Sequence, residues 1–261
     1  MNWERIKSFL IVVFVLINLF LIGFMALSFY TSTSVSNETI ADTVEILAAN
    51  QITLDPDIIP RSVGNLQNFD VRNMATDGVF PGSYTVDETG RFSYSVSLGE
   101  AVTLRNAKSV TERLLKEAGI REYAAIGQPQ LQQDGSIQVA VAQTIQRYTV
   151  FNSTVVVRFM ENTATVSGSW YQPETMPRTV RGGRDLVYIT SVLVDFINNP
   201  ERPAATAISS IAFGYRVSDY NSGLTHKTIP AVPCYRIVTA DGAVYDYNAR
   251  TGEYFAREST S

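Results

Sequence analysis

The chain contains one cysteine, a possible nucleophile, and one histidine, a possible base. His226 and Cys234 lie eight positions apart in the segment HKTIPAVPC. A cysteine protease needs a thiol and an imidazole brought together, with a third group that orients the base. Prolines interrupt this short segment at the entrance to a strand, which disfavours that arrangement. We expect a surface histidine and a packed thiol, with a catalytic pair as the alternative.

The other residue types offer no better reactive site. A zinc ion takes four ligands, which here would have to combine one His and one Cys with carboxylates. Gly182 and Gly183 are followed by Arg184 and Asp185, and not by the Lys-Ser or Lys-Thr pair of a phosphate-binding loop. We predict that the chain is not an enzyme and has no catalytic, cofactor-binding or metal-binding residue. A hydrolase is the alternative, and it would have to use His226.

A long apolar segment precedes these residues. From Phe9 to Tyr30 no charged residue occurs, and as a helix this stretch reaches about 33 Å at about 1.5 Å per residue. The hydrocarbon core of a bilayer is about 30 Å thick, whereas a secretory signal has an apolar region of only about 7–15 residues. The sequence therefore predicts a transmembrane helix over 9–30. Removal as a signal is the alternative, since Ala26 and Ser28 imitate a cleavage site.

The flanks of this segment predict its orientation. Arg5 and Lys7 precede it, and no Lys or Arg follows nearby. The positive-inside rule then places residues 1–8 in the cytoplasm and the rest of the chain outside a single-pass span in the cell membrane, with the lipid bilayer as one partner. The whole chain carries 25 acidic and 21 basic residues, which argues against a nucleic-acid partner because such binding calls for clustered cations.

The remainder predicts an α+β fold with two tandem units. Residues 31–65 predict a stalk, made of a helix over about 37–49 and an extended, proline-containing linker. Each unit is expected to be a helix packed on an antiparallel sheet, the first over 66–172 and the second over 173–261. In the first, TLRNAKSVTERLLKEAGI is amphipathic and ends at Gly119. In the second, Asp185 is the expected N-cap, and a hairpin turns at Asp241-Gly242.

Two groups of residues are candidate interaction sites. Asn18 lies near the middle of the apolar segment, where its amide is expected to contact a partner helix or, alternatively, its own helix backbone. Gly23 would permit close helix approach, but it lies about 140° around the helix from Asn18. The second group is aromatic, and in it Tyr245 and Tyr247 share one strand face near Tyr235. These tyrosines are candidates for a docking patch, but core packing under a helix is the interpretation that the sequence favours.

Several segments together resemble a known family. The start MNW, the single apolar segment, the strand SSIAFGYRV and the stretch IPAVPCYRIVTADGAVYDYNARTG are similar to the YycI/YycH family of membrane-anchored regulators. The segment TIQRYTVFNSTVVVRFMENTATVSGSW is similar to the strand pair of that family's domains, which resemble PepSY modules. Family members often have Ala-Trp where this chain has Cys234-Tyr235.

The resemblance implies a function that the residues alone do not give. It implies a regulator that acts with a YycH-like co-regulator on a sensor histidine kinase of the WalK/YycG type, a two-component system that controls cell-wall homeostasis in Gram-positive bacteria. Contact would be made through the apolar helix and the external units. The alternative is a PepSY-like binding or inhibitory module for an envelope protease or a cell-wall ligand.

Overall fold

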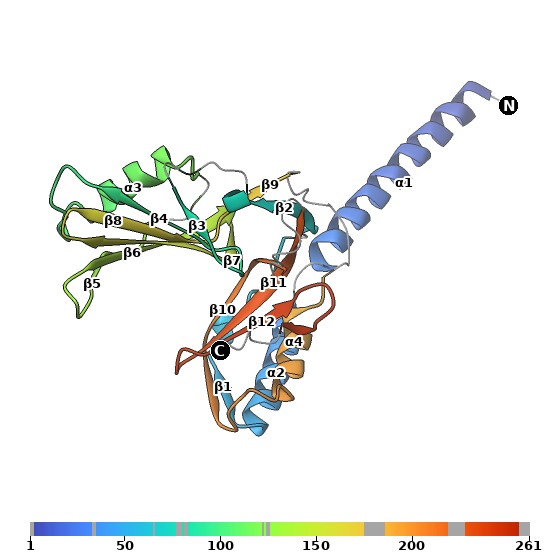
Figure 1. Ribbon diagram of the computed structural model, residues 1–261. Coiled ribbons are helices and arrows are strands. Elements are labelled where there is room, and N and C mark those ends of the chain that lie inside the picture. The colour runs from blue at the N-terminus through green and yellow to red at the C-terminus, as the bar shows by residue number, and fades with distance from the viewer. Residues whose placement is uncertain are drawn as a thin grey trace.

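The chain folds as a sheet-rich α+β protein. The computed structural model describes residues 3–32, 35–64, 66–76, 80, 83–121, 123, 126–174, 186–218 and 228–255. Within the first of these ranges the described side chains are those of Lys7 and of 10–23. These ranges contain thirteen strands, four α-helices and two short 3-10 helices (Figure 1).

The elements follow one another along the chain with few long connections. The helices are α1 Trp3–Ser32, α2 Asn37–Ala49, α3 Ala107–Glu117 and α4 Ile189–Ile197, and the 3-10 helices are η1 Pro56–Ile58 and η2 Met74–Thr76. The first strands are β1 Ile52–Leu54, β2 Phe69–Asn73, β3 Thr85–Val86, β4 Phe92–Ser97, β5 Gln130–Leu131, β6 Ile137–Ile145 and β7 Tyr148–Met160. The remaining strands are β8 Thr163–Gly168, β9 Tyr171–Pro173, β10 Thr206–Val217, β11 Ile229–Thr239, β12 Val244–Asn248 and β13 Tyr254–Phe255.

All thirteen strands belong to one hydrogen-bonded network. Its main path runs β13-β12-β11-β10-β7-β8-β4-β3, with β6 and β5 attached beside β7 and β1 beside β10. Most neighbours are antiparallel, but β1 and β7 are both parallel to β10. The network is therefore mixed, and the predicted pair of purely antiparallel sheets is incorrect.

The α3 unit, which we define as α3 with β3–β8, has its own core. The helix buries Ala107, Val110, Leu114 and Leu115 on one face, and the sheet supplies the alternate, inward-facing residues of its strands. Gly119 lies just past the helix at φ 71°, a left-handed conformation that glycine adopts without steric cost. The end of this helix matches the sequence prediction, whereas its start lies at Ala107, and Leu104, expected on the apolar face, is exposed before the helix.

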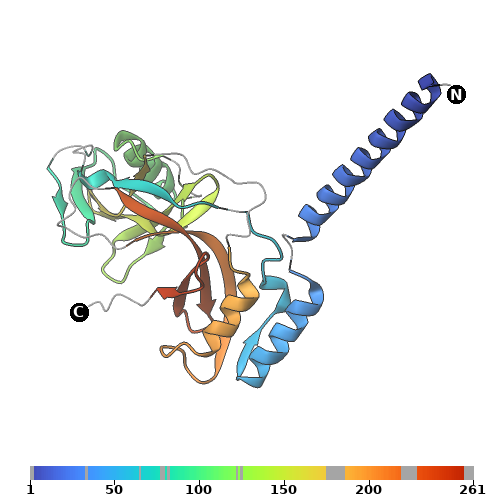
Figure 2. The same ribbon diagram turned by 90° about the vertical axis from the view of Figure 1, so that its right-hand side faces the viewer.

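The α4 unit, which we define as α4 with β10–β13, α2 and β1, has a second core. The side chains of Leu47, Ile52 and Ile59 are buried among those of α4 and the sheet. α2 begins where the sequence predicts, because the Ser36 hydroxyl accepts a hydrogen bond from the Thr39 amide at 3.1 Å. The segment expected to be a stalk thus contributes to a core, and α2, β1 and α4 lie together in Figure 2.

The two units are joined by strands and not by a linker alone. β7 and β10 approach each other at Val150 and Tyr215, and β2 pairs with both β11 and β9. A third apolar cluster lies at this joint, where the rings of Phe69 and Tyr215 meet edge to face at 4.8 Å. The stretch 172–185, expected to be the boundary between the units, is described only as far as Glu174. Asp185, the expected N-cap, lies outside the described residues, and α4 begins at Ile189 with Tyr188 as its N-cap.

The predicted transmembrane helix over 9–30, the membrane location and the extracytoplasmic placement that followed from it are contradicted. Among the residues that the structure describes, no helix is both long and apolar enough to cross a membrane.

Candidate interaction site

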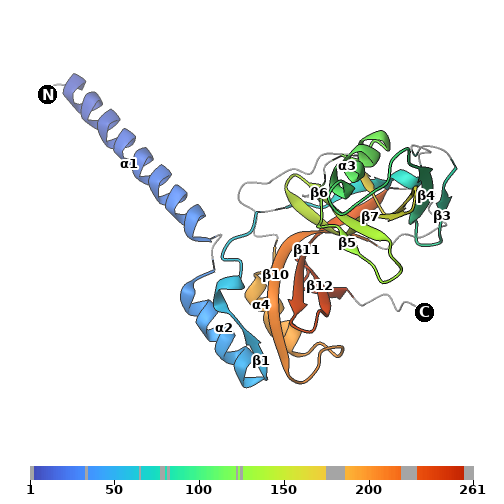
Figure 3. The ribbon, with the colours of Figure 1, turned by 90° about the vertical axis from the view of Figure 1, so that its left-hand side faces the viewer.

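α1 presents an apolar surface that no other described element covers. It projects away from both units in Figures 1 and 3. Its large apolar side chains from Leu10 to Ile22 are 36–72% exposed. No charged residue interrupts 10–23, so the surface of this part of the helix is apolar apart from one amide.

That amide belongs to Asn18, the first candidate contact residue. Its Nδ2 donates a hydrogen bond to the carbonyl oxygen of Phe14, one turn earlier, at 2.7 Å. The local interaction expected as the alternative is therefore present. One amide hydrogen and Oδ1 remain, and contact of Asn18 with a partner stays a prediction. A Cβ added at Gly23 would meet no atom within 4 Å, so this position is open to close approach.

The three candidate tyrosines lie in the core of the α4 unit. Tyr235, Tyr245 and Tyr247 are each no more than 2% exposed. They therefore form no docking patch, and core packing, the interpretation that the sequence favoured, is what the structure shows. Side chains alternate between the two faces of β11 and β12, and all three tyrosines lie on the face that α4 covers. The Phe196 ring of α4 lies 5.1 Å from the Tyr245 ring and 6.5 Å from the Tyr247 ring.

Each of these buried hydroxyl groups has a hydrogen-bond partner. Tyr235 donates to the Val187 carbonyl at 3.1 Å, and Tyr245 donates to a backbone carbonyl at 3.2 Å. The Tyr247 hydroxyl accepts from the Asn199 amide at 2.8 Å. Burial raises the pKa of Tyr247 to about 12. These side chains fix the helix on the sheet and are not available for ligand chemistry.

The candidate nucleophile is buried as well. Cys234 is 0% exposed, and its thiol donates to the Tyr235 carbonyl at 3.4 Å. Burial first, and then the nearby Asp246 carboxylate, raise the pKa of the Cys234 thiol far above its ordinary value. The thiolate that nucleophilic catalysis requires is thereby disfavoured. His226 and the Gly182-Gly183 segment lie outside the described residues.

Metal ligands do not gather in the described part of the chain. Among those residues no group of three or more His, Cys, Asp or Glu side chains could hold an ion.

An ion cluster on the sheet was not predicted from the sequence. The Asp246 carboxylate accepts two hydrogen bonds from Arg236 at 2.7 Å and one from Arg216 at 3.1 Å. Asp246 is 4% exposed. The Arg236 guanidinium lies over the Phe151 ring at 4.4 Å, which ties the sheet of the α4 unit to β7. The alternation of side chains along β10, β11 and β12 predicts that Arg216, Arg236 and Asp246 lie on the sheet face opposite the tyrosines. It does not predict that they are neighbours, because that depends on the register in which the strands pair.

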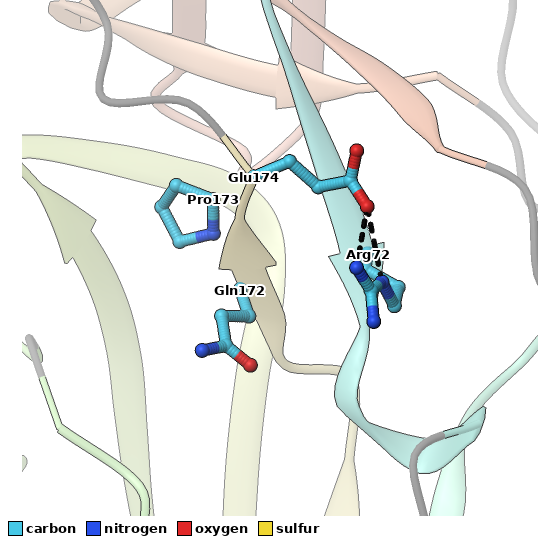
Figure 4. Close-up of a pocket in the computed structure, with 4 residues that line it drawn as sticks. All are labelled: Arg72, Gln172, Pro173 and Glu174. Atoms are coloured by element: carbon cyan, nitrogen blue, oxygen red, sulfur yellow. Dashed lines mark hydrogen bonds and ion pairs between the residues drawn. The ribbon is translucent and has the colours of Figure 1, made fainter.

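A second polar feature lies at the joint, where β2 meets β9. An open cavity of about 390 Å³ is lined by Arg72, Gln172, Pro173 and Glu174 (Figure 4). The Arg72 guanidinium donates twice to one carboxylate oxygen of Glu174, at 2.6 and 3.1 Å. Each charge faces its opposite, so the cavity offers no unbalanced charge to a ligand.

Comparisons with other proteins give no family assignment. A scan against models of known protein families finds no match, and no characterised protein is significantly similar to the chain.

Proposed function

We propose that this chain is a non-catalytic regulatory protein that acts by direct contact with a sensor histidine kinase of the WalK/YycG type, together with a YycH-like co-regulator. The choice of kinase rests on the resemblance of the sheet-forming segments to the YycI/YycH family. The exposed apolar surface of α1 is the observation that carries the proposal, because it gives the chain a means of contact.

The free energy of apolar burial favours a covered α1. Fully burying one Leu, Ile or Phe side chain contributes about 1.5–3 kcal/mol, and α1 exposes many such side chains in one continuous run. Contiguous exposed apolar surfaces of this kind mark interaction sites. Because no charge lies within 10–23, the surface that covers them is itself apolar, and we assign it to an apolar helix of the kinase.

Contact of this kind regulates without chemistry. A protein that binds one conformation of a kinase more tightly than another shifts the population toward the conformation it prefers. The size of the shift equals the difference between the two binding free energies. The chain therefore needs a surface that distinguishes two kinase states, and it needs no catalytic residue.

Site-specific photo-cross-linking in cells tests the contact. A benzophenone amino acid at Phe14 or Phe20, both on the exposed run of α1, is expected to cross-link to the kinase. The matched control carries the same label at Glu112, an exposed position on α3. Absence of the kinase from every α1 adduct, or equal capture from Glu112, would contradict the proposal.

A further inference from the structure

The segment between α1 and β2 has a second role. We infer that residues 37–59, which we call the docking segment, are a coupling element that is seated on the α4 unit and transmits changes at α1 to the edge of the sheet. The segment comprises α2, β1 and η1. The functional part of this inference rests on the proposed function, but the docking itself does not.

Contacts on the α4 unit show how the segment is seated. Leu47 is 0% exposed and Ile52 is 1% exposed, and both belong to the core formed with α4. β1 pairs in parallel with the start of β10, where Ile52 is aligned with Thr206. The Thr206 amide also donates to the Gln51 carbonyl at 3.0 Å. One apolar helix face and one short strand therefore fasten the segment.

The same segment is attached closely to α1. Residues 33–36 alone separate the end of α1 from the start of α2. The Val35 amide, just before the segment, donates to the carbonyl of Arg61, just after it, at 2.9 Å. A change in the direction of α1 therefore acts first on α2, and through α2 on α4 and β10.

The short pairing of β1 allows the segment to open while the rest of the sheet stays folded. β1 has three residues and pairs with β10 alone, whereas β6 and β7 pair over most of their length. Gln51, between α2 and β1, has a φ of 59°, a conformation that costs energy for a residue other than glycine. Regions with few pairing contacts open locally before the whole fold unfolds.

Hydrogen exchange of the full chain tests the docking. We expect the amides of α2 and β1 to exchange together, at least tenfold faster than those of β11 and β12. Leu47→Ala should accelerate exchange in α2, β1 and 206–208 by at least a further tenfold and leave β6–β8 unchanged. Ile52→Val is the milder variant and should do the same to a smaller extent.

A truncation in the other core is the matched control. Leu115 is also 0% exposed but lies in the core of the α3 unit, so Leu115→Ala should accelerate exchange in α3 and spare the docking segment. Equal acceleration throughout the chain for Leu47→Ala and Ile52→Val, or none in α2 and β1, would overturn the inference. If the amides of α2 and β1 in the wild type exchange as slowly as those of β11 and β12, the inference is also overturned.

A disulfide lock tests the coupling. Thr53 and Ala207 are paired residues of neighbouring strands, which lie about 4.8 Å apart, within the Cα separation that a disulfide bridges. The oxidised variant Thr53→Cys/Ala207→Cys should lose at least threefold of its effect on kinase phosphorylation, and a reductant should restore it. Ser95→Cys/Thr165→Cys, across β4 and β8, is the control lock and should have no effect.

The two arms separate failure of the inference from failure of the proposed function. If wild type changes phosphorylation and the Thr53–Ala207 lock leaves that change intact, the coupling is overturned. If wild type itself leaves phosphorylation unchanged, the proposed function fails, and the exchange experiment still decides whether the segment docks as described.

Discussion

At the scale of single residues, burial of the Cys234 thiol disfavours nucleophilic chemistry by this side chain. Cys234 is enclosed by β10, β11 and β12, and burial raises its pKa. We expect the native chain to react with a thiol reagent at pH 8 at least a hundredfold more slowly than the urea-unfolded chain. Reagent-binding rates measured by absorbance check this. Equal rates would mean that the thiol is accessible and that a nucleophilic role is open again.

The ion cluster gives a prediction on stability. Asp246→Asn removes the charge that Arg216 and Arg236 share, and breaking a buried pair in this way costs about 3–5 kcal/mol. The partial exposure of both arginine side chains places the expected loss at the lower end of that range. Urea unfolding of the variant measures it.

An exposed ion pair supplies the control for this substitution. Asp134 pairs with Arg158 at the surface of the α3 unit, where such pairs contribute little because water screens them. Asp134→Asn should therefore shift the unfolding midpoint far less than Asp246→Asn. Equal shifts of the unfolding midpoint in the two variants would show that the buried cluster stabilises the fold no more than the exposed pair does.

A buried tyrosine of the α3 unit gives a prediction on pH. Burial, and to a smaller extent the charge of Glu117, raise the pKa of Tyr94 from 10.0 to about 12. The folded state thus holds this proton more tightly than the unfolded state, so its contribution to stability is complete below pH 10 and is lost as the pH rises toward 12. The urea midpoint should fall between pH 9 and pH 11.5, and by less in Tyr94→Phe. An equal fall in both chains would contradict the assignment.

At the scale of elements, local sequence patterns predicted individual helices better than their partners. The spacing of apolar residues predicted α2 over 37–49, and Gly119 marked the end of α3. The same patterns could not show that α2 packs on α4, because a helix with one apolar face does not specify which element covers it. Pro56 and Pro60 indicated an extended linker, and the structure places the intervening chain in a short 3-10 helix that continues the docking segment.

The approach of β7 and β10 is a further element-scale feature that the sequence did not predict. There the side-chain amide of Asn152 pairs with the backbone of Val217: it donates to the carbonyl at 2.7 Å and accepts from the N–H at 2.9 Å. Between β6 and β9, the side-chain amide of Gln143 pairs in the same way with the backbone of Tyr171. Such reciprocal pairing depends on residues about 30–65 positions apart in the sequence, which local propensity cannot detect.

Gly214 makes this approach possible and can be tested. A Cβ there would lie 2.3 Å from the Thr149 carbonyl oxygen. Gly214→Ala should therefore destabilise the fold by about 1–3 kcal/mol, the usual cost of overpacking. Gly99→Ala is the control because a Cβ there meets no atom within 4 Å. Urea unfolding compares the two, and equal stabilities would mean that the strands do not approach as described.

At the scale of the whole molecule, two cores are held in one strand network with an apolar helix outside both. The sequence predicted two units and an apolar helix and favoured core packing for the tyrosines, but it assigned residues 37–59 to a stalk. That error arose because burial depends on which distant segments meet. The predicted membrane crossing is contradicted by the described residues, whereas contact with a kinase remains a proposal.

The level of kinase phosphorylation tests the central claim most directly. The kinase should be assayed in cells that produce wild type, a chain with Ile17→Ser and Leu21→Ser on α1, or no chain. We predict at least a threefold difference between wild type and no chain. We also predict that the α1 variant, at equal abundance, behaves as if no chain were present. Identical phosphorylation in all three would contradict regulation by contact through α1.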